Sequence, residues 1–326
     1  MRFFHRRRFL RLTAGATVLP VISHVAKAQP YPSLPVRIVV PFPPAGLSDI
    51  VTRLIGQWLS ERLGTPFVIE NRPGAGSNLG TEVVVNAPPD GYTLLNLSSA
   101  NATNATMYEK LNFDFIRDIA PVASLVRFPY VLEVNPSIPV RTVPELIAYA
   151  KANPGRLSIA SAGTGTPAHI AGELFKLMTG VDMVHVPYRG AALALTDLLG
   201  GQVQVMIDNM AASLAHIRTG RLRALAVTTA TRLETLPDVP TVAEFVPGFE
   251  ASSMNGVGAP KRTPTEIVNK LNEEINTALA DPKIKARIAD LGLTPLVGSP
   301  ADLEKLIAEE TKKWGNVIRA ANIKAN

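Results

Sequence analysis

Apolar runs and amphipathic segments alternate through the first third of the chain. The run from Ile38 to Val40 meets a Pro/Gly-rich break at 41–46, and apolar residues then recur at helical spacing: Ile50, Val51, Leu54, Ile55, Trp58 and Leu59. This order predicts a buried strand, a tight loop and a helix. Two more strands are predicted at 67–69 and 92–97, with a short helix at 78–85 between them. Such alternation indicates a parallel sheet with helices on both faces.

The middle of the chain repeats this pattern. A strand at 157–160 leads into a loop at 161–166, and Pro167 then opens a helix that ends at Gly180. Proline is favoured at the first helical position and glycine just beyond the last one. Thr142 and Glu145 have capping-box spacing ahead of another helix. Further strands are predicted at 130–134, 184–186, 203–207 and 225–227, which together indicate a second sheet.

The C-terminal part is helical by the same criteria. Helices are predicted at 264–280, 282–291 and 300–320, with no strand among them. A tail without strands cannot build a third sheet, so we expect it to pack back on the first domain. The predicted domains are 29–130 joined with 254–326, and 131–253, with chain crossings near 128–135 and 245–256. Loops at the carboxyl ends of both sets of strands would then line a ligand cleft between the domains.

Residues 1–28 have the three parts of an export signal: a basic start, a moderately apolar stretch and the small-residue site Ala26-Lys27-Ala28. Arg6 and Arg7 favour the twin-arginine route, although an ordinary secretory signal with extra arginines has the same layout. We expect cleavage after Ala28 and a periplasmic protein. The chain has 33 basic and 27 acidic residues, and the signal accounts for the whole excess. The formally neutral mature chain therefore gives no support to nucleic-acid binding.

Several kinds of chemistry lack a signature. The absence of cysteine excludes disulfides and thiolate metal sites. The glycines from Gly74 to Gly80 have the wrong spacing for a dinucleotide fingerprint. His169 and His185 lack metal-ligand spacing. A structural role is favoured for His185, whereas His169 fits a structural role and a ligand contact equally well. Asp208, at a strand end, is either a turn residue or a ligand contact, and we favour the contact. We expect no cofactor and no metal.

Six motifs in this order together resemble one family, the Bug receptors, which are the periplasmic components of tripartite tricarboxylate transporters. The motifs are Pro-Phe-Pro-Pro-Ala-Gly-Leu-Ser-Asp at 41–49, Asn-Arg-Pro-Gly-Ala-Gly at 71–76, Ser-Ala-Gly-Thr-Gly-Thr at 161–166 followed by His169, His-Val-Pro-Tyr-Arg-Gly at 185–190, Arg-Ala-Leu-Ala-Val at 223–227, and Leu-Pro-Asp-Val-Pro-Thr-Val-Ala-Glu at 236–244.

The resemblance implies an α/β, two-domain periplasmic-binding-protein (Venus flytrap) fold, with mixed, mostly parallel sheets and helices on both faces. It also implies that segments 42–49 and 161–166 pinch a carboxylate, partly through ordered water. Combined with the strand ends described above, it gives a set of expected ligand-binding residues: Phe42, Ala45, Gly46, Leu47, Asp49, Ser98, Ser99, Ala100, Asn101, Ser161, Gly163, Thr164, Thr166, His169, Tyr188, Asp208 and Met254.

Three residues depart from the family pattern. The family usually has glycine where Leu47 and Ser77 stand, and often tryptophan where Met254 stands. Leu47 either fills part of the cleft and selects a smaller or more apolar acid, or turns outward without effect, and we favour the first. Met254 would leave a roomier or more adaptable wall.

The sequence therefore predicts an exported, monomeric solute-binding protein that delivers a small organic acid (a carboxylate, an amino acid or an aromatic acid) to the membrane permease subunits of a tripartite tricarboxylate-type transporter. One alternative is an exported hydrolase on the same scaffold that uses His169 and Asp208. Another is a receptor that presents its ligand to a signalling partner.

Overall fold

The computed structural model describes residues 31–324, so the predicted export signal lies outside the described residues. The strands are β1 (Val36–Val40), β2 (Phe67–Asn71), β3 (Thr93–Ser98), β4 (Ile119–Val134), β5 (Ser158–Ser161), β6 (Val184–Pro187), β7 (Val205–Asn209), β8 (Arg223–Val227), β9 (Ser252–Pro260) and β10 (Thr294–Pro295). The helices are α1 (Leu47–Leu63), α2 (Asn78–Val85), α3 (Ser99–Met107), α4 (Phe115–Asp118), α5 (Val143–Ala152), α6 (Pro167–Thr179), α7 (Ala191–Leu199), α8 (Met210–Arg218), α9 (Thr265–Ala280), α10 (Pro282–Asp290) and α11 (Pro300–Ala320), with short 3₁₀ turns η1 (Ala75–Ser77) and η2 (Val242–Glu244).

The first group of strands has the order β2-β1-β3-β9-β4, with β10 also paired to β4. Strands β1, β2 and β3 are parallel, whereas β9 and β10 run antiparallel to their partners. Neighbouring residues of one strand serve opposite faces: Ile38 packs in the core with α1 and α9, and Val39 in the core with α2 and α11. This period of two places helices on both faces of the sheet.

The second group contains β4, β7, β5, β6 and β8. Strands β5, β6 and β7 are parallel, and the end of β4 pairs antiparallel with β7 and β8. Side chains from β4, β5, α5 and α6 form its main core, and residues of α7 with β7 form a smaller one on the other face.

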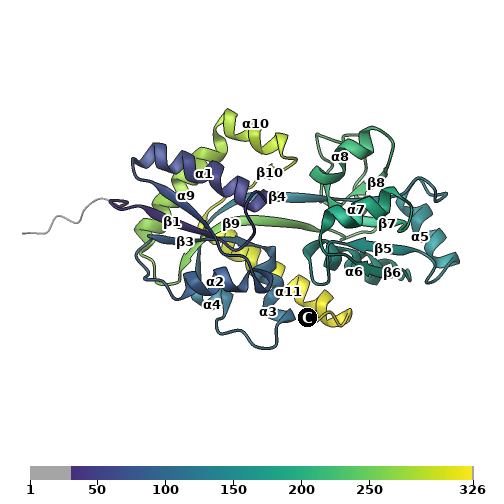
Figure 1. Ribbon diagram of the computed structural model, residues 1–326, viewed down its shortest axis with the longest axis horizontal. Helices are drawn as coiled ribbons and strands as arrows, with labels where there is room; N and C mark the ends of the chain where they lie inside the picture. The colour runs from purple at the N-terminus through teal and green to yellow at the C-terminus, as the bar shows by residue number, and fades with distance from the viewer. Residues whose placement is uncertain (1–30, 325–326) are drawn as a thin grey trace, which may run out of the picture. The chain divides into compact units, whose positions relative to one another are not determined.

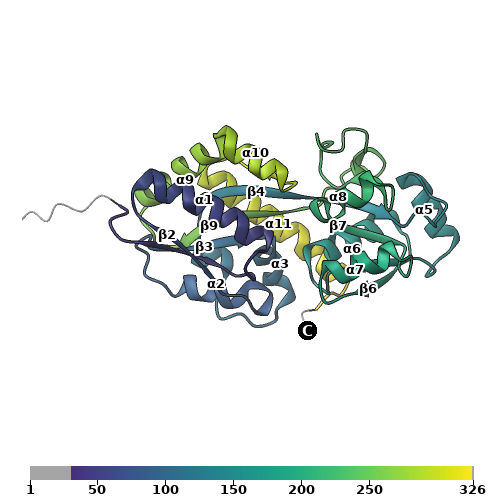
Figure 2. The same ribbon diagram turned by 45° about the horizontal axis from the view of Figure 1, so that its top comes forward.

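Strand β4 belongs to both groups, as Figures 1 and 2 show. Its pairs with β9 run from Ile119↔Pro260 to Pro129↔Ser252, and its pairs with β7 begin directly afterwards at Tyr130↔Asn209. The two strands β4 and β9 thus lie where the sequence places its chain crossings. The domain limits at 130/131 and 253/254 stay a prediction.

The C-terminal segment differs from the prediction in two ways. It contains a strand, β10, which pairs with β4 at Pro295↔Val126. Two residues, one of them a proline, are too few to give a periodic signal. In addition, α11 packs against both groups: Leu303 and Ile307 lie in a core of the first group, and Trp314 and Ile318 lie in the main core of the second. Figure 2 shows α11 extending from beside α3 toward α6.

Within residues 31–324, no helix has both the length and the apolar composition needed to cross a bilayer.

Candidate functional site

A pocket of about 520 Å³ is lined by residues from both groups of strands. From the first group come Phe42, Gly76, Ala100, Asn104, Met107 and Tyr108; from the second come Gly163, Thr164, Gly165, Thr166, Pro167, Pro187, Tyr188 and Arg189. The carboxyl ends of β1, β3, β5 and β6 lead into these segments, which is where parallel sheets hold their ligands.

The loop between β5 and α6 is fixed by its own side chains. Thr166 is the N-cap of α6: its hydroxyl accepts from the His169 N–H at 3.4 Å and donates to the Gly163 carbonyl at 2.8 Å. Ser161 Oγ accepts from the Gly163 N–H at 3.2 Å. Among the residues described, neither the N–H nor the hydroxyl of exposed Thr164 has a partner. Thr164 therefore offers the donors that remain for a ligand.

Gly165 carries the closest approach of this loop to the first group. Its φ is +77°, and an added Cβ would lie 2.8 Å from the Met107 Sδ on α3. A side chain at this position would be strained by the backbone angle and would displace the end of the Met107 side chain, so glycine is favoured.

His169 lies behind the loop and does not line the pocket. It is only 6% exposed, its Nδ1 accepts from the Gly165 N–H at 3.0 Å, and its ring stacks on His185. Tyr188 does line the pocket, while its hydroxyl donates to Asp197 Oδ2 at 2.7 Å. Burial and the Asp197 carboxylate raise the pKa of Tyr188 to about 12, so the phenol stays protonated.

Asp49 holds the loop on the first side. Its buried carboxylate accepts from the Ala45 N–H at 2.9 Å, from Arg53 Nε at 3.0 Å and from Asn71 Nδ2 at 2.9 Å. Burial alone would raise the pKa of Asp49, but the hydrogen bonds from Arg53, Asn71 and Ala45 outweigh burial and hold it below its ordinary value. Asp49 thus stays ionised and supports the loop without lining the pocket.

The other predicted residues of this loop are less enclosed. Phe42 lines the pocket, whereas exposed Ala45 and Gly46 are absent from its lining. Leu47 begins α1 and packs, partly buried, against the core that contains Val51. Its side chain occupies neither of the two places that the sequence suggested for it.

The segment Ser98–Asn101, expected to contact the ligand, forms the end of β3 and the start of helix α3. Ser98 and Asn101 form a capping box, and Asn101 Nδ2 also donates to Thr81 Oγ1 at 2.8 Å. Ser99 is buried and its Oγ accepts from the Met254 N–H at 3.1 Å. Of the four residues expected here, only Ala100 reaches the pocket lining.

Two predicted contacts are buried elsewhere. The Met254 side chain packs in the core beside Val39. Asp208 is 4% exposed, and its Oδ2 has no partner among the residues described. Burial raises the pKa of Asp208 to about 6 and that of Glu133, on the neighbouring strand, to about 8.

Sequence reasoning missed several lining residues. Asn104, Met107 and Tyr108 belong to α3 or its end, and this helix was not predicted. Arg189 stood in the 185–190 motif but was assigned no role. It is the one charged side chain in the lining, and no ion pair is found for it within residues 31–324. A charged residue directly after a strand end and next to Tyr188 was the available signal.

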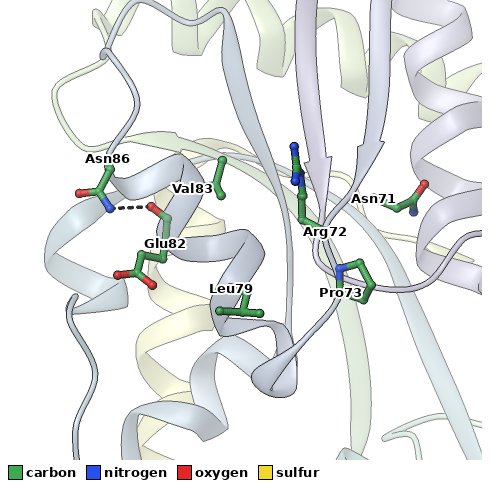
Figure 3. Close-up of a pocket in the computed structure, with 7 residues that line it drawn as sticks. All are labelled: Asn71, Arg72, Pro73, Leu79, Glu82, Val83 and Asn86. Atoms are coloured by element: carbon green, nitrogen blue, oxygen red, sulfur yellow. Dashed lines mark hydrogen bonds between the residues drawn. The ribbon is translucent and has the colours of Figure 1, made fainter.

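A second hollow, of about 580 Å³, lies between α2 and the segment that follows β2 (Figure 3). It is formed by Asn71, Arg72 and Pro73 after β2 and by a stripe of α2: Leu79, Glu82, Val83 and Asn86. It shares no residue with the first pocket and lies against one group of strands only. We therefore take the pocket lined from both groups as the candidate site.

No cluster of three or more His, Cys, Asp or Glu side chains suited to a metal ion occurs within residues 31–324. The lining of the candidate site consists of loop backbone, hydroxyl groups, aromatic rings, the Asn104 amide, the Met107 thioether and Arg189.

Comparison with known proteins identifies the family. Residues 51–323 match the model of the tripartite tricarboxylate transporter family receptor. The chain belongs to this family. BugT of Bordetella pertussis is 39% identical over 307 residues, which cover 93% of this chain and 94% of BugT. The resemblance to Bug receptors is thereby confirmed.

Solved structures of relatives show the same fold. Rpa4515 of R. palustris, solved with adipate, is 40% identical, has a TM-score of 0.79, and is matched over 90% of this chain and 99% of its own. MatC (Rpa3494) of Rhodopseudomonas palustris, solved with bound malate, is 33% identical with a TM-score of 0.74 over 88% of this chain and 100% of its own. The predicted periplasmic-binding-protein fold class is confirmed.

Proposed function

We propose that this chain is an exported receptor that binds a small organic carboxylate in the 520 Å³ pocket and delivers it to the permease of a tripartite tricarboxylate-type transporter. The observation that carries the proposal is a pocket lined from both groups of strands, with Thr164 donors and the Arg189 guanidinium on one side. Donors and a cation suit an anionic ligand. The family match and the adipate and malate in the structures of two relatives support a carboxylate.

The hydrolase alternative is not favoured by the site. His169 and Asp208 are 6% and 4% exposed, and neither is among the lining residues. A general base must come within hydrogen-bonding reach of the group that it deprotonates. Neither residue offers that reach to a ligand in this pocket.

The binding proposal is tested by calorimetry with a panel of acids that includes adipate and malate. Thr164→Ala removes an exposed hydroxyl, and because a hydrogen bond to a charged group contributes roughly 1.5–3 kcal/mol, we expect about ten- to a hundredfold weaker binding with unchanged unfolding. Thr166→Ala is a poorer test because its hydroxyl caps α6.

Thr277→Ala changes an exposed threonine of α9 outside the pocket and is the matched control. This variant should bind the acids as the wild type does. Equal affinities of the wild type and Thr164→Ala would remove Thr164 from the binding site. Delivery is measured as uptake of the bound acid by cells with and without the receptor, and receptor-independent uptake would contradict the proposed partner.

A further inference from the structure

Two stacked imidazoles support the pocket loop from behind. The rings of His169, on α6, and His185, on β6, lie 3.7 Å apart between centroids at an interplanar angle of 15°. Both residues stand next to loop 161–166, yet neither lines the pocket. The proposed carboxylate site does not use them, so their arrangement needs another explanation.

His169 holds Gly165. The Gly165 N–H donates to His169 Nδ1 at 3.0 Å, and both groups are buried. A ring nitrogen accepts a hydrogen bond only while it carries no proton, so the proton of neutral His169 is on Nε2, which faces Glu173 Oε1 at 3.7 Å. A proton added at Nδ1 would turn the acceptor into a donor. The buried Gly165 N–H would then lose its partner, and unpaired buried donors destabilise a structure.

His185 reaches the same loop through Ser161. Its Nε2 lies 2.7 Å from Ser161 Oγ, which in turn accepts from the Gly163 N–H at 3.2 Å. The pairing Ile159↔His185 between β5 and β6 places Ser161 two residues further along the same face, so the short contact follows from strand register. Two loop glycines are therefore held by one stacked pair, Gly165 directly and Gly163 through a hydroxyl.

The charged groups around the pair act in opposite directions. Glu173 and Lys176, both on α6, are the charged groups that act on His185. Of the other elements packed against α6 or paired with β6, the elements β5, β9 and α3 carry no acid or amine, β7 carries Asp208, and α11 carries the Glu310–Lys313 pair. Burial, the neighbouring His169 and Lys176 lower the pKa of His185 to about 4, against the opposing effect of Glu173. When the loop is released, the pKa of His185 returns toward its ordinary value, so the ring takes up a proton more readily than it does in the supported loop. Acid therefore favours the unsupported loop as the pH falls from about 6.5 toward 4.

We propose that His169 and His185 are positioning residues for the ligand loop, and that the loop keeps its binding shape only while Nδ1 of His169 carries no proton. The ligand and a proton then compete through the loop: each lowers the affinity of the protein for the other. This inference rests on the proposed carboxylate site, because loop 161–166 supplies its donors.

The test compares three proteins with adipate as the probe. His169→Leu removes the acceptor for Gly165 and should weaken binding about tenfold at pH 7, which corresponds to the loss of one buried hydrogen bond. His169→Asn/His185→Gln keeps amide groups near the positions of Nδ1 and Nε2 but cannot titrate. We expect this double variant to bind within about threefold of the wild type at pH 7.

The decisive quantity is the ratio of wild-type to double-variant affinity between pH 7 and pH 4. Adipate itself gains protons over this range, but it does so equally for both proteins, so the ratio isolates the imidazoles. We expect the ratio to fall about tenfold, since one unit of pKa difference between bound and free protein is a factor of ten. His216→Gln, on α8, is the matched control and should follow the wild type. A ratio that stays constant overturns the proposal.

Nuclear magnetic resonance of the free protein separates this proposal from the proposed function. The Gly165 amide signal should move with the imidazole titration in the wild type and stay fixed in the double variant. If neither adipate nor any other acid of the panel binds, the proposed carboxylate-binding function is wrong. The titration of the Gly165 amide signal still tests whether the imidazoles hold the loop. A Gly165 amide signal that does not change as the imidazoles titrate would contradict the proposed role of His169 and His185, whichever ligand binds.

Discussion

Loop 41–46, on the first side of the pocket, is fixed by a carboxylate, and loop 161–166, on the second side, is fixed by an imidazole and a hydroxyl. Asp49 accepts the Ala45 N–H at 2.9 Å, and His169 accepts the Gly165 N–H at 3.0 Å. In each case a side chain from the first turns of the following helix holds a backbone N–H of the loop before it. The geometry is shared, but the proton chemistry of the acceptors is opposite.

The difference predicts a sequence of events in acid. Hydrogen bonds hold the pKa of Asp49 below its ordinary value despite burial. Its contribution to stability is therefore complete at any pH above the ordinary pKa, and it is lost as the pH falls through the lowered pKa. The pKa of His185 is lowered to about 4, so its contribution is complete above its ordinary value near 6.5 and is lost between there and about 4. The second loop should therefore lose its support at a higher pH than the first.

Asp49→Ala should break the first loop with the largest effect. It leaves the Ala45 N–H and one of the two Asn71 amide hydrogens without an acceptor and removes the carboxylate partner of Arg53, while Asn71 still donates to the Phe42 carbonyl. We expect the free energy of unfolding to fall by about 3 kcal/mol, which is less than three charge-assisted hydrogen bonds because Arg53 is half exposed and regains water. Urea unfolding followed by tryptophan fluorescence measures the change. Asp182→Ala, at an exposed position, should leave the midpoint unchanged; an equal loss in both would show that Asp49 has no special role.

Leu47→Gly separates packing from ligand selection in the first loop. Leu47 packs partly buried against the core at the first position of α1, so we expect a loss of about 1–2 kcal/mol from the exposed apolar surface and the flexible glycine. The ranking of a panel of acids, measured by thermal shift and calorimetry, should stay the same. Leu34→Gly, at a position that is 61% exposed, is the control for stability. A changed ranking would return Leu47 to the ligand site.

Ser77→Gly should give the smallest effect, and in the stabilising direction. Ser77 has φ = +86°, and its buried Oγ has no partner among the residues described. Glycine relieves both penalties but adds freedom to the unfolded chain, so we expect a net gain of about 0.5–1 kcal/mol in unfolding free energy. Ser137→Gly, in a loop whose φ is not positive, should give no gain. A loss at Ser77 would mean that its hydroxyl has a stabilising role.

Elements with strong local signals were predicted well from sequence. The bounds of α2 and α11 agree with the prediction, and α6 begins at the predicted Pro167 and has its C-cap at the predicted Gly180. Helix α3 was missed because it has few apolar residues: its capping box and the hydrogen bonds of Asn101 and Asn104 stabilise it instead. Strand β4 is longer than predicted since Pro121 and Pro129 read as breaks, although both have strand partners in β9.

The candidate site was predicted less completely than the fold. Strand ends and glycine-rich loops located the pocket, because backbone topology fixes where parallel strands terminate. A side chain reaches the pocket only if it is not buried behind the pocket surface. The pattern of residues along the sequence does not show how deeply each side chain is buried. His169, Asp208 and Met254 are buried behind the surface, and Arg189 lines the pocket although only its place beside a strand end pointed to it.

Helix α11 is the last element to be synthesised, and it supplies residues to the core of the second group. Trp314 and Ile318 complete the same core as Tyr130 and Leu132, which leave the ribosome much earlier. The second core therefore stays incomplete, with apolar side chains still uncovered, until the end of the chain has been made. Complete packing of the second group therefore waits for the last turns of α11.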